Sequence, residues 1–117
     1  MITLTVNGTT LTAALADNSS AEALKELLAD GSITLKMRDY ANMEKVGSFG
    51  RSLPTNDEHI DTEAGDLILY QGNQLVIYYA PNSWSFTRLG KIEDVTASEL
   101  KEILGNGKVE VTLALAE

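Results

Sequence analysis

The sequence predicts a mainly β protein, a closed β-barrel with two short capping α-helices. Three observations carry this prediction: short segments alternate apolar and polar residues, glycine-containing turns separate them, and two capping patterns open short amphipathic runs. Two short helices cannot cover both faces of so many strands, whereas closing the sheet on itself removes its edges. We therefore expect a barrel with the helices at its ends.

The N-terminal segments predict a hairpin followed by a helix. Residues 2–6 alternate apolar side chains with threonine, and Asn7-Gly8 supplies the two positive-φ residues of a tight turn before alternation resumes at Leu11. Ser19-Ser20-Ala21-Glu22 has the spacing of a capping box and predicts an amphipathic helix over 20–30. These two elements come from local pattern alone.

A third strand and a long loop follow. Alternation over 33–37 predicts a strand that delivers Arg38 and Tyr40 to its end. From Ala41 to Ala64 the periodicity disappears, which predicts a long loop. A loop of this length in a compact domain usually has a function beyond connecting two elements. Long loops in compact domains often carry binding residues.

The C-terminal half predicts three further elements. The apolar runs 67–70 and 75–79 flank the turn Gln71-Gly72-Asn73 and should form a hairpin at the centre of the sheet. After an aromatic segment, Thr96-Ala97-Ser98-Glu99 has capping-box spacing and predicts a second helix that stops at Gly105. A closing strand fits residues 109–115.

Composition limits the class of protein. The 117 residues fit a single domain, 1–117, and a net charge of −8 with no basic stripe argues against nucleic acid and anionic membranes as partners. The chain has no cysteine and no apolar run long enough to span a bilayer, so a cytoplasmic location is our expectation. No pattern in the sequence calls for a cofactor.

Three segments resemble a known family. Gly65–Tyr70, Gly72–Tyr79 and Arg88–Ile92 look like the small prokaryotic cyclophilin-like proteins, and the similarity extends over essentially the whole chain, including Asn42–Gly47 and Leu53-Pro54. The resemblance implies a closed barrel of the eight-stranded type with short capping helices and an open cleft on one side of its wall. Cyclophilins proper are prolyl isomerases, but no Phe-Met-x-Gln-Gly arrangement follows any arginine here, so their isomerase residues are not carried over.

Polar residues at the end of the third strand are the first candidates for a ligand site. A cation among hydrogen-bonding groups at a barrel mouth can orient a carbonyl or a carboxylate, and Arg38 follows directly from a strand, a rigid base. The alternative is an ion-paired loop anchor with Glu44 and Lys45 in solvent. The candidates from this segment are Arg38, Tyr40, Asn42 and Glu44.

Aromatic residues concentrated near residue 80 are the second candidates. Tyr78 and Tyr79 should point to opposite faces of their strand, so we expect at least one to leave the core. Trp84, in the loop after Pro81, is either a lid on the core or a platform for a ligand, and the preference of large aromatics for burial favours the lid. The candidates from this region are Tyr79, Trp84, Phe86 and Arg88.

Catalytic and metal chemistry have weaker support. His59 is the only histidine, and its acidic surroundings over 57–63 match no known metal cage, so a solvated loop is the preferred interpretation and we expect no metal site. No Gly-x-Ser-x-Gly elbow is present. The leading hypothesis is a binding module for a peptide segment or small molecule; the alternatives are a prolyl cis/trans isomerase and a partner-docking protein.

Overall fold

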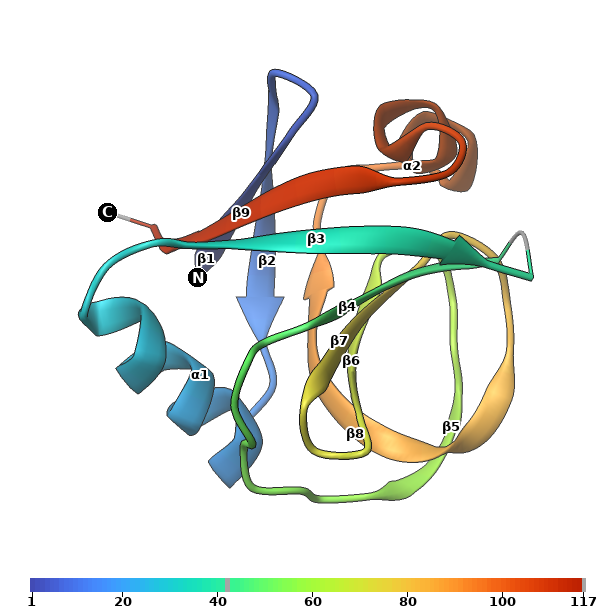
Figure 1. Ribbon diagram of the computed structural model, residues 1–117. Coiled ribbons are helices and arrows are strands. Elements are labelled where there is room, and N and C mark those ends of the chain that lie inside the picture. The colour runs from blue at the N-terminus through green and yellow to red at the C-terminus, as the bar shows by residue number, and fades with distance from the viewer. Residues whose placement is uncertain (42, 117) are drawn as a thin grey trace.

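The computed structural model describes residues 1–41 and 43–116, and this part of the chain forms nine strands and two helices (Figure 1). Their order confirms the mainly β prediction. The bounds in chain order are β1 Ile2–Val6, β2 Thr9–Leu15, α1 Ser19–Ala29, β3 Ile33–Tyr40, β4 Glu44–Ser48, β5 Glu58–Asp61, β6 Asp66–Tyr70, β7 Gln74–Tyr78, β8 Ser83–Ile92, α2 Ala97–Leu104 and β9 Val109–Leu115.

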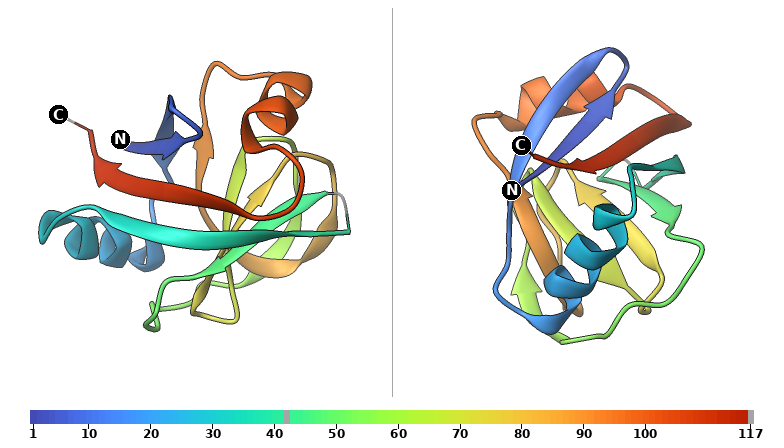
Figure 2. Two further views of the ribbon diagram at one scale, coloured as in Figure 1. Left: turned by 45° about the horizontal axis from the view of Figure 1, so that its top comes forward. Right: turned by 90° about the vertical axis from the view of Figure 1, so that its left-hand side faces the viewer.

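Eight of the strands close into an antiparallel barrel. The strands lie in the order β2-β1-β9-β3-β4-β7-β6-β8, and β8 pairs back with β2 through Ala13 to Leu15. The remaining strand, β5, pairs with the first half of β8 and lies outside the closed ring. The closed barrel that the sequence predicted is therefore confirmed, and Figure 2 shows the ring from two further sides.

Local turn chemistry fixes the two predicted hairpins. Asn7 and Gly8 have φ values of 48° and 80°, and Gln71 and Gly72 have 55° and 76°. Two consecutive positive-φ residues match the twist of a tight hairpin turn, which closes between the paired Val6 and Thr9 and between the paired Tyr70 and Gln74. The hairpin of β6 and β7 is also central, because β4 and β8 cover its two edges.

Both helices form where the sequence predicted them, with one correction at a cap. The side-chain oxygen of Asn18, not Ser19, caps α1 by accepting a hydrogen bond from the Ala21 backbone N–H at 2.8 Å. Asn18 has extended backbone angles, as an N-cap requires, whereas Ser19 is already helical. The second capping box is confirmed, because Thr96 and Glu99 exchange their side-chain to backbone hydrogen bonds.

The segment expected to be a long loop contains two strands, β4 and β5. The prediction failed because β4 does not alternate in the usual way: its inward positions are Lys45 and Gly47, and its outward position Val46 is apolar. Gly47 is needed there, since a Cβ would lie 2.8 Å from the carbonyl oxygen of Lys36 on β3. A charged residue and a glycine thus occupy interior positions that apolar side chains usually mark.

Apolar clusters cover both faces of the central hairpin. One face of β6 and β7 presents Leu67 and Ile77 to the barrel interior, which also buries Leu24 of α1 and Leu100 of α2. The opposite face packs in a smaller cluster on the outside of the barrel wall, made of Ile60, Ile68, Val76, Tyr78 and Phe86. Because both faces are covered, β6 and β7 read as nearly continuous apolar runs.

Lys45 is the only charged side chain with no exposed surface among the described residues. Its ammonium group donates to the carbonyl oxygen of Gly107 at 2.6 Å and lies 3.4 Å from Asp39 Oδ1. Asp39 also accepts a short hydrogen bond from the hydroxyl of Tyr79. The interpretation of Lys45 as a solvent-exposed loop residue was therefore wrong, and its charge is compensated inside the barrel.

Neither helix in the described part of the chain has the length and apolar content needed to cross a lipid bilayer.

Candidate functional site

A cleft of about 560 Å³ lies on the outer face of the barrel wall. Its floor is the outward face of β4 and β7, and its rims come from the end of β3 and the start of β8. Four of the seven aromatic side chains of the protein line it, together with one cation, one carboxyl group and several amides. The lining residues are Arg38, Tyr40, Met43, Glu44, Val46, Tyr70, Gln71, Gln74, Tyr78, Asn82 and Trp84.

Strand register brings Arg38, Tyr40 and Glu44 of the first predicted group into this cleft. Arg38 pairs with Val46 across β3 and β4, and Tyr40 pairs with Glu44. Paired residues of antiparallel strands project to the same face, so these side chains all face outward. Arg38 is exposed and makes no ion pair within residues 1–41 and 43–116, which leaves its guanidinium available to a ligand.

A carboxyl–phenol pair occupies the floor of the cleft. Glu44 is opposite Tyr78 in the register of β4 and β7, and the two side chains are hydrogen-bonded. Burial raises the pKa of the Glu44 carboxyl, although the Tyr78 hydrogen bond opposes the shift. Burial likewise raises the pKa of Tyr78 to about 12, and the hydroxyl also accepts from Asn82 Nδ2 at 3.2 Å. Glu44 therefore holds a proton more readily than an exposed glutamate.

Trp84 and Tyr40 form exposed aromatic rims. Trp84 lies in β8 opposite Ile60 of β5, not in a loop, and 61% of it is exposed; Tyr40 is 63% exposed. The interpretation of Trp84 as a lid on the core was wrong, because β5 and the small outer cluster already cover the strand beneath it. Two large aromatic side chains are thus presented to solvent at one hollow.

Three of the other predicted residues, Phe86, Tyr79 and Arg88, lie outside the cleft lining. Phe86 is buried beneath it, with its ring centroid 5.8 Å from that of Tyr78. Tyr79 points into the barrel, where it donates to Asp39. Arg88 lies 3.6 Å from Asp66, a carboxylate that is 1% exposed, and so compensates a buried charge. Asn42 lies outside the described residues.

The expectation that Tyr78 or Tyr79 would leave the core was wrong, because each faces a different apolar cluster. The cleft uses Tyr78, which was not among our candidates, in place of Tyr79. A signal for this existed in the sequence: Gln74 is the polar member of an apolar strand, and it marks the outward set of positions to which Tyr78 belongs. Tyr70, Gln71 and Asn82 were also missed, since residues at a strand end, in a hairpin turn or in a connecting loop carry no binding signal of their own.

The cleft offers groups for recognition and for proton transfer. Its described lining residues include no serine, cysteine, histidine or lysine, and its ionisable groups are Arg38, Glu44 and three tyrosines. Within residues 1–41 and 43–116, no three His, Cys, Asp or Glu side chains gather as a metal-binding group. His59 itself is exposed on β5, 3.4 Å from Asp61.

The protein is a closed antiparallel barrel with a cleft on its outer wall, and two short helices pack their apolar side chains against the interior of the barrel. This is the cyclophilin-like architecture. The family model described as "Cyclophilin-like family" matches residues 4–114. The chain therefore belongs to the cyclophilin-like family, as the resemblance in its sequence implied.

A comparison with curated proteins gave no match. Among solved structures, the chain is similar to "Structure of McbB in complex with tryptophan", with a TM-score of 0.67 and 17% sequence identity. The alignment covers 98% of this chain and 44% of that one, so the chain spans less than half the length of the protein it resembles. This likeness concerns the fold.

Proposed function

We propose that the protein binds, in this outer cleft, a ligand that combines an aromatic or apolar group with a carboxylate. The observation that carries the proposal is the pairing of Tyr40 and Trp84, the two most exposed large hydrophobic side chains described, on the rim of a hollow that also contains the unpaired Arg38. Leaving two large aromatics in water is unfavourable, and such residues typically mark contact surfaces.

Opposite charges in the cleft suggest how the ligand is oriented. The Arg38 guanidinium has the planar fork of donors that fits a carboxylate, and Glu44 with Tyr78 offers a hydrogen-bonding site for an amine or amide. The aromatic floor and rims fit the ring. An aromatic amino acid, or a peptide end carrying one, has all three groups.

The tryptophan in the McbB complex supports this proposal, because it is a small molecule with these three groups, held in a complex with a protein that contains the same fold. The support concerns the class of ligand. The position of the cleft here comes from the residues of this chain alone.

Calorimetric titration with a matched ligand pair tests the proposal. We expect N-acetyl-phenylalanine to bind more tightly than N-acetyl-phenylalanine amide, which keeps the ring and loses the charge. Replacing Arg38 by Gln should abolish this difference, and Trp84→Ala should weaken both ligands. Arg51→Gln is the matched control, since Arg51 is an exposed arginine outside the cleft lining.

Equal binding of acid and amide by the wild-type protein would contradict the role of Arg38. Unchanged binding by Trp84→Ala would remove the cleft from consideration altogether.

Prolyl isomerisation is the second candidate, because it needs only a donor that weakens amide resonance and an apolar site for the ring, and Arg38 and Val46 are neighbours in the cleft. We expect no acceleration of isomerisation for a panel of X-Pro peptides at high protein concentration. Acceleration that Arg38→Gln abolishes would instead make the protein an enzyme.

A further inference from the structure

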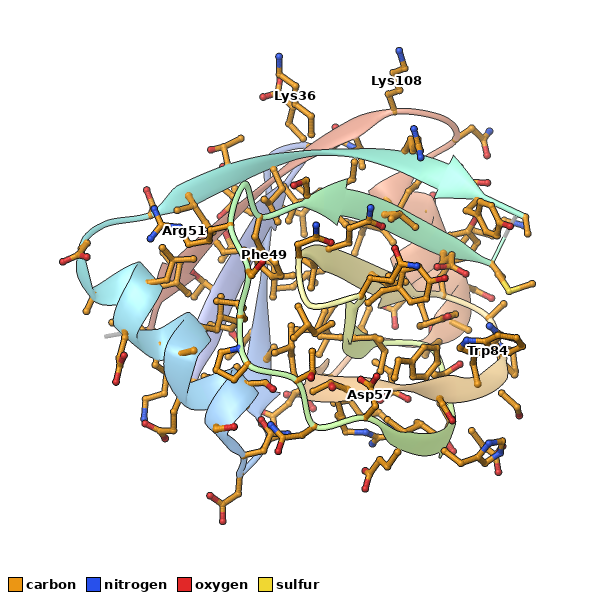
Figure 3. All side chains as sticks on the ribbon, turned by 60° about the horizontal axis from the view of Figure 1, so that its bottom comes forward. Lys36, Phe49, Arg51, Asp57, Trp84 and Lys108 are labelled. Carbon is orange, nitrogen blue, oxygen red and sulfur yellow. The ribbon has the colours of Figure 1, made fainter. Side chains whose placement is uncertain are left out.

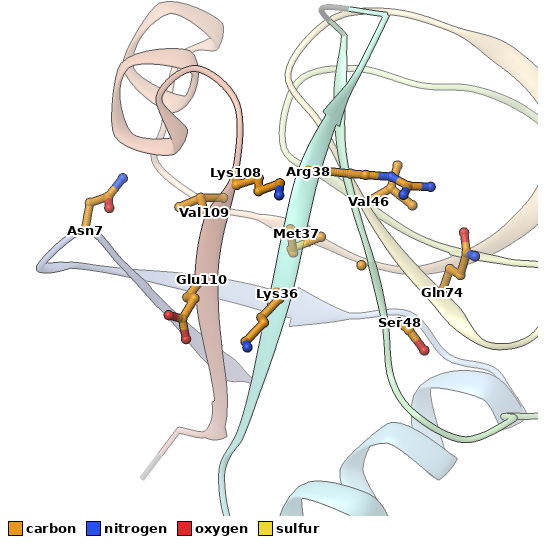
Figure 4. A pocket seen from close by; sticks show the side chains of 11 residues that line it. Asn7, Lys36, Met37, Arg38, Val46, Ser48, Gln74, Lys108, Val109 and Glu110 are labelled. Atoms are coloured by element: carbon orange, nitrogen blue, oxygen red, sulfur yellow. The ribbon is translucent and has the colours of Figure 1, made fainter.

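A second hollow of about 790 Å³ adjoins the cleft on the same outer face. The two hollows share Arg38, Val46 and Gln74, so they form one groove across β9, β3, β4 and β7. Figure 4 shows Lys108, Arg38, Val46 and Gln74 following one another across these strands.

The second hollow is cationic in a protein whose net charge is −8. Three cationic side chains, Lys36, Arg38 and Lys108, line it with a single carboxylate, Glu110. None of the three cations makes an ion pair within the part of the chain that the structure describes. Figure 3 shows Lys36 and Lys108 projecting from the same side of the molecule. Glu110, opposite Lys36 in the register of β3 and β9, offsets one of the three positive charges, so cations still outnumber carboxylates in the hollow and the local field favours an anionic partner.

The buried Lys45 fixes the backbone next to Lys108. Lys45, fully buried in β4, donates at 2.6 Å to the carbonyl of Gly107, the residue before Lys108. This contact ties the start of β9 to β4 and so fixes the position from which Lys108 projects. The flexible stems of Lys36 and Lys108 suit several dispersed negative charges better than one small ion.

The length of the groove sets the size of the occupant. Neighbouring strands lie about 4.8 Å apart, so the path from β9 over β3 and β4 to β7 is about 14 Å. An extended peptide rises about 3.3 Å per residue and covers that path with about four residues. The two hollows together exceed what one amino acid fills.

We infer that the second hollow is an anion subsite that selects an acidic peptide segment, with glutamate or aspartate side chains about four residues from the aromatic residue held in the cleft. This inference rests on the proposed function, because the cleft supplies the aromatic anchor. Lys36 and Lys108 supply the selectivity for acidic side chains.

Fluorescence anisotropy with labelled, blocked peptides tests the inference. The probes carry one phenylalanine and two glutamates about four residues away, in both sequence orders, and the matched peptides replace glutamate by glutamine. At low ionic strength we expect one order of the glutamate peptide to bind about tenfold more tightly than its glutamine counterpart. The advantage should shrink as salt screens the exposed charges.

Two double variants test whether Lys36 and Lys108 cause the tighter binding of the glutamate peptide. Lys36→Ala/Lys108→Ala should reduce binding of the glutamate peptide to the level of the glutamine peptide and leave the glutamine peptide unchanged. Lys25→Ala/Lys101→Ala removes the same charge from exposed positions on α1 and α2, and it should retain the full selectivity.

Three results would overturn the inference. One is equal binding of the glutamate and glutamine peptides, and another is selectivity that survives in Lys36→Ala/Lys108→Ala. The third is full competition by inorganic phosphate at a concentration that does not affect the glutamine peptide, which would make the subsite one for small anions. If the glutamine peptide binds and responds to Trp84→Ala, the cleft proposal stands even when the acidic subsite fails.

Discussion

Replacing Trp84 by alanine should weaken ligand binding while leaving the fold largely intact. The residue is the second of β8, at the rim of the cleft, and is 61% exposed, so less than half of its surface packs against the protein. Phe86 is the matched control, because it lies two residues further along the same strand and is only 2% exposed.

The magnitudes follow from the buried area. An entire tryptophan side chain buries at most about 250 Å², so the two fifths of Trp84 that are covered amount to about 100 Å². At about 25 cal/mol per Å² this is an upper limit of about 2.5 kcal/mol, and the Cβ that alanine retains lowers it further. Truncating Phe86 removes a core aromatic and should cost about 3–5 kcal/mol.

Urea unfolding followed by circular dichroism measures both values, and titration with N-acetyl-phenylalanine measures binding by the folded Trp84→Ala protein. We expect a destabilisation of about 1–2 kcal/mol for Trp84→Ala with a clear loss of affinity. If Trp84→Ala lost as much stability as Phe86→Ala and kept its ligand affinity, Trp84 would be a packing residue and the reasoning from its exposure would be refuted.

Three further predictions concern stability. Because burial raises the pKa of Glu44, the carboxyl ionises at a lower pH in the unfolded state than in the folded state. As the pH rises from about 4.5, the free energy of unfolding of the wild type should therefore fall relative to that of Glu44→Gln. A difference between the two proteins that stays constant with pH, measured by urea unfolding, would contradict this prediction. Gly90→Ala should destabilise by about 1–3 kcal/mol, because its Cβ would lie 2.3 Å from the Ala14 carbonyl oxygen, and an unchanged urea midpoint would refute this contact. Lys45→Ala should cost about 3–5 kcal/mol by removing the cation that compensates Asp39, whereas Lys45→Met, which keeps the volume, should cost less by the same measurement.

Much of the fold could be predicted because its signals are local. Asn7-Gly8 and Gln71-Gly72 specify turn geometry directly, and Thr96 with Glu99 specifies a helix start within four residues. The closure of the barrel is contained in no local pattern; it was predicted from the number of strands against only two short helices, and the resemblance to the cyclophilin-like family implied it as well.

The features that could not be predicted depend on long-range pairing. Inward and outward positions in β4 are set by its neighbours β3 and β7, so the burial of Lys45 is invisible without its partners Asp39 and Gly107. The choice of Tyr78 over Tyr79 for the cleft has the same origin, because both faces of β7 are covered by apolar residues. The outward position of Arg38 continues the alternation of the preceding buried positions, Leu35 and Met37, of its strand.

The position of β9 between β1 and β3 has a consequence for synthesis on the ribosome. Leu4 of β1 pairs with Leu113 of β9, and Leu35 of β3 pairs with Val111 of β9. The edges of β1 and β3 that face β9 therefore stay unpaired until nearly all of the described chain has been synthesised. Unpaired edges attract other strands, and pairings of such large sequence separation form slowly. The nascent chain should therefore depend on chaperone protection until β9 emerges, and a truncation before Val109 should aggregate rather than fold.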